Sequence, residues 1–372
     1  MNTTETRGSG VAVAGMGVPQ DSTDPDDDNP QENAGPHCHL DLGGITIDHS
    51  LMDAETPGQN FEITISEKER EQGALFPETL RLATLLVHTR GYVILRGGMP
   101  IGVAHEAAER FRQIHADCMA SREGDGWWQV ARDTRAVFWE RNHRWRIFPK
   151  LAEVFANPWV IANPLAMEVL GELLGSEIHC KFVSSDTCMK GTTLQSPHRE
   201  MGGGNTWEAQ SFIVNVPLGV CGLHNGPLEV WPGGSHLWRN ELLRRLQVND
   251  DVQDGRNAEF EWFATLFPSR KVELHPGDVL IRDPGLMHRG TVNESDDPRS
   301  MLTVCYFRDG FVHDYGSPEH NLDRALWVKL EPSVKRLFSY VFEGSNAAKP
   351  APAAAATPQN VNTPAVSPLW ED

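Results

Sequence analysis

The chain lacks the features that mark secreted, membrane and nucleic-acid-binding proteins. No run approaches the roughly 20 apolar residues of a membrane span. Positive charge is scarce, because 33 Lys and Arg stand against 51 Asp and Glu, for a net charge of −18. This balance argues against a nucleic-acid or anionic-membrane partner, since like charges repel. The first residues have no basic stretch followed by a long apolar run, so we expect a cytoplasmic protein without a secretory leader.

Paired cysteines are also missing. The six cysteines are scattered along the chain and form no CxxC motif. A zinc or disulfide framework would need cysteines at regular, closely paired spacings. The cysteines are therefore predicted to be reduced thiols, as is usual in the cytosol.

The two ends of the chain are poor in large apolar residues. Residues 1–36 are rich in Gly, Pro, Asp, Asn and Thr and are predicted to be a disordered acidic tail. Residues 345–372 are rich in Pro and Ala and are predicted to be a second disordered tail. The ordered part is then a single domain over residues 37–344, with no sign of an internal repeat. Nothing in the sequence indicates an oligomer.

Within this domain, helix signals come first and strand signals follow. From residue 178 onward, short apolar runs alternate with turn residues, which is typical of a sandwich or barrel. A last helical segment is expected near 323–341. The predicted fold class is mainly β with flanking helices. Helices are predicted over 77–91, 105–118 and 163–175, with a strand in GYVILRG (91–97).

One short motif has the composition of a metal site. In an extended backbone, His198 and Glu200 lie on the same face, since they are two residues apart. His288 follows the turn and strand HPGDVLIRDPGLM and is a candidate third ligand. Two histidines and one carboxylate leave three octahedral positions open, as in non-haem Fe(II) oxygenases. Arg299, eleven residues after His288, offers a planar fork for the carboxylate of a co-substrate.

Taken together, these segments resemble a known family. HRE, HNGPLEVWPGGSH and HPGDVLIRDPGLMHRGTVNESDDPR are similar to the motifs of the phytanoyl-CoA dioxygenase family of Fe(II)/2-oxoglutarate oxygenases. The resemblance covers roughly residues 91–307. It also includes the order of the GYVILRG strand, a long helix, the NPLAMEVLGELLG helix and the metal-bearing strands.

The resemblance implies a double-stranded β-helix, or jelly roll, with helices packed outside it. His198, Glu200 and His288 would be the iron ligands. Arg299 would bind the distal carboxylate of 2-oxoglutarate, and Lys181 is a weaker candidate for holding this co-substrate. The implied reaction uses Fe(2+), 2-oxoglutarate and O2, and releases succinate and CO2.

The implied substrate is a small molecule that is oxidised at an unactivated carbon, most simply by hydroxylation. Desaturation, epimerisation and ring formation stay open. The low-complexity tails are similar to those of fungal or bacterial natural-product tailoring members, for example in alkaloid biosynthesis. Three alternatives remain: an acyl-CoA 2-hydroxylase, a non-catalytic jelly-roll binding protein and a zinc hydrolase. An acyl-CoA site should present a basic cluster, and the sequence shows no obvious one.

Two positions depart from the family pattern. The family usually has aspartate where this chain has Glu200, which is one methylene longer but still an oxygen donor. Because the carboxylate is present, a halogenase is disfavoured, since that chemistry needs a small residue there. The motif PGGSH replaces the more common PGSH, and its His236 is expected to be structural. His224 and His275 lie in predicted turns and are expected to be solvated.

Residues 125–149 form an unusual segment with four tryptophans among several arginines. One interpretation is a long packed loop or a helix pair that covers the barrel. The other is a substrate lid, in which aromatic side chains shape the site and charged ones meet the substrate. The sequence does not separate the two.

Overall fold

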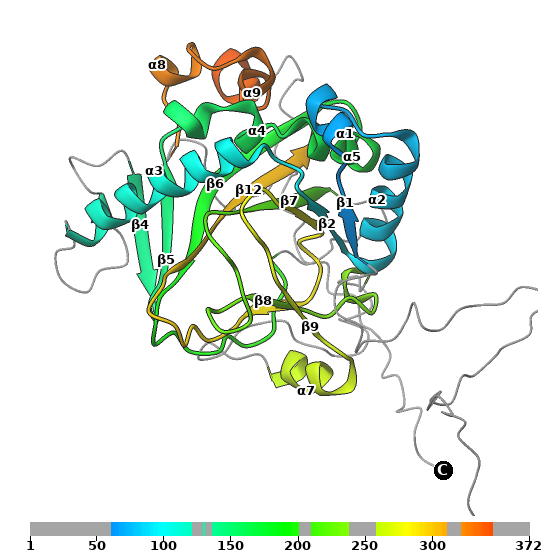
Figure 1. Cartoon of the computed structure of the whole chain (residues 1–372), viewed down its shortest axis with the longest axis vertical. Helices are drawn as coiled ribbons and strands as arrows, with labels where there is room; N and C mark the ends of the chain where they lie inside the picture. Colours follow the sequence, from blue (N-terminus) through cyan, green and yellow to red (C-terminus); the bar gives the residue numbers. More distant parts are fainter. Residues whose placement is uncertain are drawn as a thin grey trace, which may run out of the picture. The chain divides into compact units, whose positions relative to one another are not determined.

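The computed structural model describes residues 61–120, 129–130, 136–200, 210–237, 258–310 and 321–344 (Figure 1). In these residues the strands form one sheet of nine strands and one of three. Helices precede, interrupt and follow the strands along the chain. The predicted fold class, mainly β with flanking helices and a jelly-roll core, is confirmed.

The nine-stranded sheet is built around three antiparallel strands that lie side by side in Figure 1. β12 (Arg299–Arg308) pairs with β6 (Ile178–Cys188) on one side and with β7 (Ser211–Pro217) on the other. The strand order is β1-β2-β10-β7-β12-β6-β5-β4-β3, and β1 and β2 are a parallel pair. The other members are β1 (Glu62–Thr64), β2 (Tyr92–Arg96), β3 (Gln129–Val130), β4 (Ala136–Arg141), β5 (Arg144–Pro149) and β10 (Val279–Arg282).

The three-stranded sheet faces one side of the larger sheet. It has the order β11 (His288–Gly290), β8 (Leu228–Val230) and β9 (Arg270–Val272), and both pairings are antiparallel. Apolar side chains of β8 and β9 pack in one buried cluster with Tyr92 of β2 and Leu280 of β10. Two sheets with an apolar interior between them form the sandwich expected of a jelly roll.

The helices begin and end where their sequences favour it. α2 (Pro77–Arg90) has proline in its first turn and ends at Gly91, which adopts a left-handed φ of 82°. α5 (Pro164–Leu174) begins after Asn163, whose side chain accepts hydrogen bonds from two backbone N–H groups. The other segments are α1 (Glu67–Gln72), α3 (Ile101–Ala120), η2 (Glu153–Ala156), α4 (Pro158–Ile161), η3 (Ser235–Leu237), α7 (Ala258–Leu266), α8 (Arg324–Trp327), α9 (Pro332–Arg336) and η5 (Tyr340–Gly344).

The outer face of the nine-stranded sheet is apolar and covered by helices. Val93, Val214, Leu302 and Val304 belong to the largest buried cluster, together with residues of α2, α3 and α5. Each of these four side chains is at most 1% exposed. Burial of this face against helices is the main apolar core of the domain.

The inner face of the same sheet, which faces the short sheet, is partly polar. Asn215 and Thr303 are buried there and hydrogen bond to each other at 3.0 Å. Arg282 and Arg299 are also buried, at 3% and 1% exposure. Because side chains alternate between faces along a strand, apolar residues on one face leave these polar ones on the other. The polar inner face is therefore the part of the sheet that is suited to binding a ligand or a metal ion.

The segment 125–149 does not have the structure that we expected. Its described residues form the strands β3, β4 and β5 at the edge of the nine-stranded sheet, not a loop or a helix pair. The sequence pattern that indicates a strand lies in β5, where Arg144 and Arg146 alternate with the buried Trp145 and Ile147. Such alternation is typical of a strand with two different faces. The segment therefore contains an extension of the sheet, and its role as a substrate lid stays a prediction.

The other predictions for the chain have mixed outcomes. The expected tails, residues 1–36 and 345–372, lie outside the described residues, and the domain limits of 37–344 remain a prediction. Cys38 also lies outside them. In the part of the chain that the structure describes, the five cysteines are buried and unbridged. No helix in that part is long and apolar enough to cross a membrane.

Candidate active site

Backbone pairing brings two of the predicted ligands together, although they are ninety positions apart in the chain. His198 and His288 form an antiparallel bridge, with N–H···O distances of 2.8 and 2.9 Å in the two directions. Their imidazole rings have centroids 4.5 Å apart. His288 is the first residue of β11, which pairs with β8. The two histidines therefore sit side by side at the edge of the short sheet.

A backbone carbonyl fixes the tautomer of each histidine. Nδ1 of His198 lies 2.9 Å from the carbonyl oxygen of Ser196, and Nδ1 of His288 lies 2.8 Å from that of Leu286. A carbonyl oxygen only accepts, so each Nδ1 carries the proton and donates. In this tautomer a neutral imidazole presents Nε2 with a free lone pair, which is the form that ligates a metal.

Glu200 lies beside this pair and is held by an arginine. Its Oε1 accepts a hydrogen bond from Nη2 of Arg282 at 3.0 Å, while Nε of Arg282 donates to Oδ1 of Asn215 at 3.0 Å. Burial acts to raise the pKa of Glu200, but its contact with His288 and the charge of Arg282 hold this pKa well below its usual range. Glu200 is therefore an ionised carboxylate at neutral pH.

The donor set fits a divalent metal ion by its chemistry. Burial, with the charges of Arg282 and His198, lowers the pKa of His288 to about 4, so its ring is neutral. Its Nε2 lies 3.4 Å from Oε1 of Glu200. A cation between the two atoms could accept a lone pair from each of them. Two adjacent ligands of one octahedral ion are about 3 Å apart, which is close to this separation.

The side chains of His198, Glu200 and His288 do not, however, form a complete three-ligand metal site in this structure. Among the described residues, no three His, Cys, Asp or Glu side chains have the geometry of a metal site. The contacts described above are pairwise, and Glu200 is shared with Arg282. The role of His198, Glu200 and His288 as ligands therefore remains a prediction.

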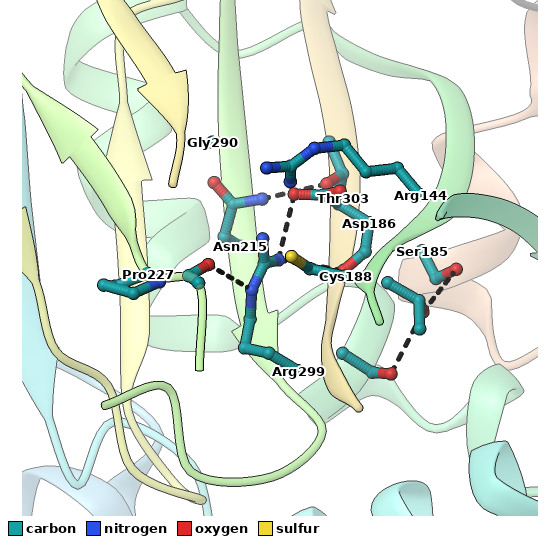
Figure 2. A network of polar contacts seen from close by, with 12 residues as sticks. Arg144, Ser185, Asp186, Cys188, Asn215, Pro227, Gly290, Arg299 and Thr303 are labelled. Atoms are coloured by element: carbon teal, nitrogen blue, oxygen red, sulfur yellow. Dashed lines mark hydrogen bonds and ion pairs between the residues drawn. The ribbon is translucent and has the colours of Figure 1, made fainter. Parts of the chain in front are cut away.

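Arg299 lies at the start of β12 with its side chain inside the molecule, as Figure 2 shows. Nε donates to the carbonyl oxygen of Gly226 at 2.8 Å. Nη1 donates to the backbone oxygen of Asp186 at 3.0 Å and to its Oδ2 at 2.9 Å. Nη2 is buried and has no hydrogen-bond partner among the described residues. The Nη2 donors of the guanidinium are therefore open to an anion that the described residues do not supply.

Asp186 is the carboxylate that this arginine contacts. It lies on β6, opposite Met301 of β12, and its side chain is 34% exposed. Burial acts to raise its pKa, but the charges of Arg299 and Arg144 outweigh burial and lower it. Asp186 is therefore ionised and neutralises only part of the positive charge around it.

The other residues that the sequence analysis considered are Lys181, His236 and His224. Lys181 is half-buried at a bulge of β6, where the β12 pairing passes from Phe182 to Cys180; its role stays a prediction. His236 is 3% exposed and its Nε2 lies 2.9 Å from the carbonyl oxygen of His88. His224 is 86% exposed and lies 3.7 Å from a carboxylate oxygen of Glu294.

Sequence analysis missed Arg282, Asn215 and Asp186. Asn215 interrupts the apolar run SFIVNVP, Arg282 ends the apolar run VLI, and Asp186 lies in the more polar stretch FVSSDTC, all on buried strands. A buried charged side chain needs a partner, because the cost of burying it alone is high. Such interruptions could have been read as positions that face a site.

The short sheet, the paired histidines and the buried arginine define a jelly-roll protein with a polar candidate site between its two sheets. The sequence profile of the phytanoyl-CoA dioxygenase (PhyH) family matches residues 87–301, more than half of the chain. The protein belongs to this family. Family membership agrees with the predicted class, an oxidoreductase of the Fe(II)/2-oxoglutarate type. Iron and 2-oxoglutarate stay the cofactor and co-substrate that the sequence predicts.

Solved structures with a related fold are more distant. AviO1 from Streptomyces viridochromogenes Tue57 is 18% identical, with a TM-score of 0.44, covering 63% of this chain and 96% of its own. EctD from S. alaskensis with bound Fe is 18% identical, with a TM-score of 0.43, covering 65% and 80%. The α-ketoglutarate-dependent epimerase SnoN from nogalamycin biosynthesis is 16% identical, with a TM-score of 0.45, covering 67% and 96%. Likenesses at this distance say nothing about the substrate of this chain.

Proposed function

We propose that this protein is an Fe(II)- and 2-oxoglutarate-dependent dioxygenase that oxidises an unactivated carbon of a small molecule, most simply by hydroxylation. The observation that carries the proposal is the proximity of His198, His288 and Glu200: the two imidazole rings have centroids 4.5 Å apart, and Oε1 of Glu200 lies 3.4 Å from Nε2 of His288. Family membership supports the same reaction class.

In this proposal each residue has a separate task. His198, His288 and Glu200 hold the iron, and the hydrogen bonds of the two Nδ1 atoms keep both rings in the ligating tautomer. Bound iron would supply the activation of O2, in which 2-oxoglutarate is converted to succinate and CO2. Arg299 binds the distal carboxylate of 2-oxoglutarate through the N–H groups of Nη2.

The site also has to keep water away from the reacting centre. Tyr92 and Leu280 pack between the two sheets next to the polar inner face. Apolar walls of this kind lower the local dielectric and strengthen the contacts of the charged groups. Arg282 and Asn215 complete the inner wall and fix the direction of the Glu200 carboxylate.

The substrate remains the most open part of the proposal. We favour a small natural product, in keeping with the tails and the segment 125–149. A long-chain acyl-CoA is the alternative, and its nucleotide phosphates would need basic side chains outside the iron site. Calorimetric titration with an acyl-CoA, next to a screen of small metabolites for faster 2-oxoglutarate turnover, separates the two. Tight acyl-CoA binding would overturn the natural-product assignment.

The reaction class is tested by succinate formation from 2-oxoglutarate in the presence of Fe(II). We expect His288→Ala to abolish this turnover, because the ion loses one of its two nitrogen ligands. His224→Ala is the matched control, since His224 is a mostly exposed histidine away from the ligands. An unaltered rate in His288→Ala would contradict the proposal, and a zinc hydrolase or a non-catalytic binding protein would then have to be considered.

A further inference from the structure

A second arginine faces the same part of the inner face as Arg299. Arg144 begins β5, and the ladder register pairs it with Cys188 of β6. Cys188 is also the register partner of Arg299 on β12. The three residues therefore form one row across three adjacent strands, with their side chains on the same face. Strands are about 4.8 Å apart, so the two arginine Cα atoms are about 10 Å apart, within reach of two long side chains that converge.

Arg144 has more unused donors than Arg299. Its Nη2 donates to the carbonyl oxygen of Thr291 at 2.8 Å. Its Nε and Nη1 are buried and have no hydrogen-bond partner among the described residues. A buried N–H without a partner is costly, and native proteins keep few of them. With Nη2 of Arg299, three nitrogen atoms of this row carry donors with no acceptor.

The charges in this row also leave one position for an anion. The charges of Arg299, Arg144 and, least, Arg146 outweigh burial and lower the pKa of the single carboxylate, that of Asp186. Figure 2 shows Arg144, Arg299 and Asp186 in one polar network. One carboxylate cannot neutralise several guanidinium groups. A further carboxylate would offset positive charge and supply two acceptor oxygens.

Glycine residues leave space for the side chains of Arg144 and Cys188. A Cβ atom on Gly290 would lie 2.4 Å from Nη1 of Arg144, and one on Gly226 would lie 2.6 Å from Sγ of Cys188. Any larger residue at position 290 would therefore displace the guanidinium of Arg144. Gly290 is needed there because the arginine passes directly against its Cα.

The same strand connects this group to the candidate iron site. Gly290 lies two residues after His288 on β11, on the same face, about 6.7 Å along the strand. A ligand with one end at the iron and a carboxylate at the other end can span this step. 2-oxoglutarate, an extended five-carbon diacid, has this form.

We propose that Arg144 is a second positioning residue for 2-oxoglutarate, which binds the distal carboxylate together with Arg299. This inference rests on the proposed function. In it, Nη2 of Arg299 and the Nε and Nη1 donors of Arg144 share the two oxygens of the carboxylate. Asp186 holds the guanidinium of Arg299 in place and offsets one positive charge.

The test is direct binding to the full-length protein loaded with Mn(II), measured by calorimetry without turnover. The probes are 2-oxoglutarate and 2-oxopentanoate, which has a methyl group where the distal carboxylate would be. We expect Arg144→Gln to weaken 2-oxoglutarate binding by about tenfold to a hundredfold, the range for a lost hydrogen bond to a charged group. Binding of 2-oxopentanoate should change less than about twofold, because that ligand makes no contact with Arg144.

Two more variants separate a direct role from a structural one. Arg144→Lys keeps the charge without the fork and should fall between the wild type and Arg144→Gln. Gly290→Ala should weaken 2-oxoglutarate binding as well, by displacing the guanidinium. Arg110→Gln, an arginine of α3 paired with Glu153, is the control and should bind normally.

The outcomes distinguish this inference from the proposed function. Unchanged 2-oxoglutarate binding in Arg144→Gln, with weakened binding in Arg299→Gln, overturns the role of Arg144 alone. Equal losses for both probes in Arg144→Gln also overturn it, since they show a general structural defect. Failure of the wild-type protein to bind 2-oxoglutarate at all overturns the proposed function and this inference together.

Discussion

The two faces of the nine-stranded sheet are built from the same strands but differ in composition: one is apolar and the other carries buried charged side chains. The outer face is apolar and is covered by α2, α3 and α5. The inner face carries Arg144, Asp186, Arg282 and Arg299, with several hydrogen-bond donors left unpaired among the described residues. Substitutions on the outer face should therefore change stability, while those on the inner face should change metal or ligand binding.

The largest effect on stability is expected on the outer face. Leu302 is 0% exposed within the main apolar cluster. Leu302→Ala should lower the free energy of unfolding by about 2–5 kcal/mol, the range for a buried Leu→Ala cavity. Urea unfolding measures this loss. The turnover of the fraction that remains folded should stay unchanged, and a large fall in turnover per folded molecule would show that the two faces are coupled.

Arg282 tests the inner face next to the candidate iron ligands. We expect Arg282→Met to lower the affinity for Co(II) or Fe(II) by about tenfold to a hundredfold, because Glu200 loses the donor that directs its carboxylate. Loss of the positive charge of Arg282 acts in the opposite direction and favours metal binding, because it removes repulsion between Arg282 and the metal cation. We expect orientation to dominate, since the Glu200 side chain is long and rotatable.

Metal titration followed by absorbance checks this expectation, with urea unfolding in parallel because Arg282 is buried. Arg282→Lys keeps the charge and loses the fork, so it separates the two contributions. Tighter metal binding in Arg282→Met would mean that charge repulsion, not orientation, is the main effect of Arg282.

The smallest of the predicted effects is a loss of stability at the start of α1, a helix outside the sheets. Glu69 accepts hydrogen bonds from the backbone N–H of Phe76 at 2.9 Å and from the N–H and hydroxyl of Ser66 at 3.0 and 2.7 Å. Burial acts to raise the pKa of Glu69, but these hydrogen bonds outweigh it and lower the pKa to about 2. Glu69→Gln should cost about 1–2 kcal/mol at neutral pH.

The pH dependence of that loss has a defined sign. Because the pKa is lower in the folded state, ionised Glu69 stabilises the protein fully above about pH 4.5. This contribution is lost as the pH falls toward 2. Unfolding measured at about pH 7 and pH 3 should thus show a smaller difference between wild type and Glu69→Gln at the lower pH. An equal difference at both values would contradict the role of the ionised form.

Much of this arrangement could be predicted from the sequence, because local signals specify it. Proline and glycine fix the ends of α2 and α5, and the spacing of His198, Glu200, His288 and Arg299 indicates the site and its family. The row formed by Arg144, Cys188 and Arg299 could not be predicted. It depends on the register among three strands that are far apart in the chain, and no local pattern determines that register.

The hairpin that carries Arg144 has a consequence for how this protein could change. β4 and β5 are joined by Asn142 and His143, which adopt φ values of 51° and 60°, as a tight two-residue hairpin turn requires. Deleting one residue from this turn, with a two-residue turn kept, would invert β5, so that Trp145 would take the place of Arg144 against Cys188. The sheet could keep its strands, yet an aromatic ring would replace a cation beside Arg299. With the proposed role of Arg144, a one-codon deletion at a surface turn would therefore alter co-substrate preference.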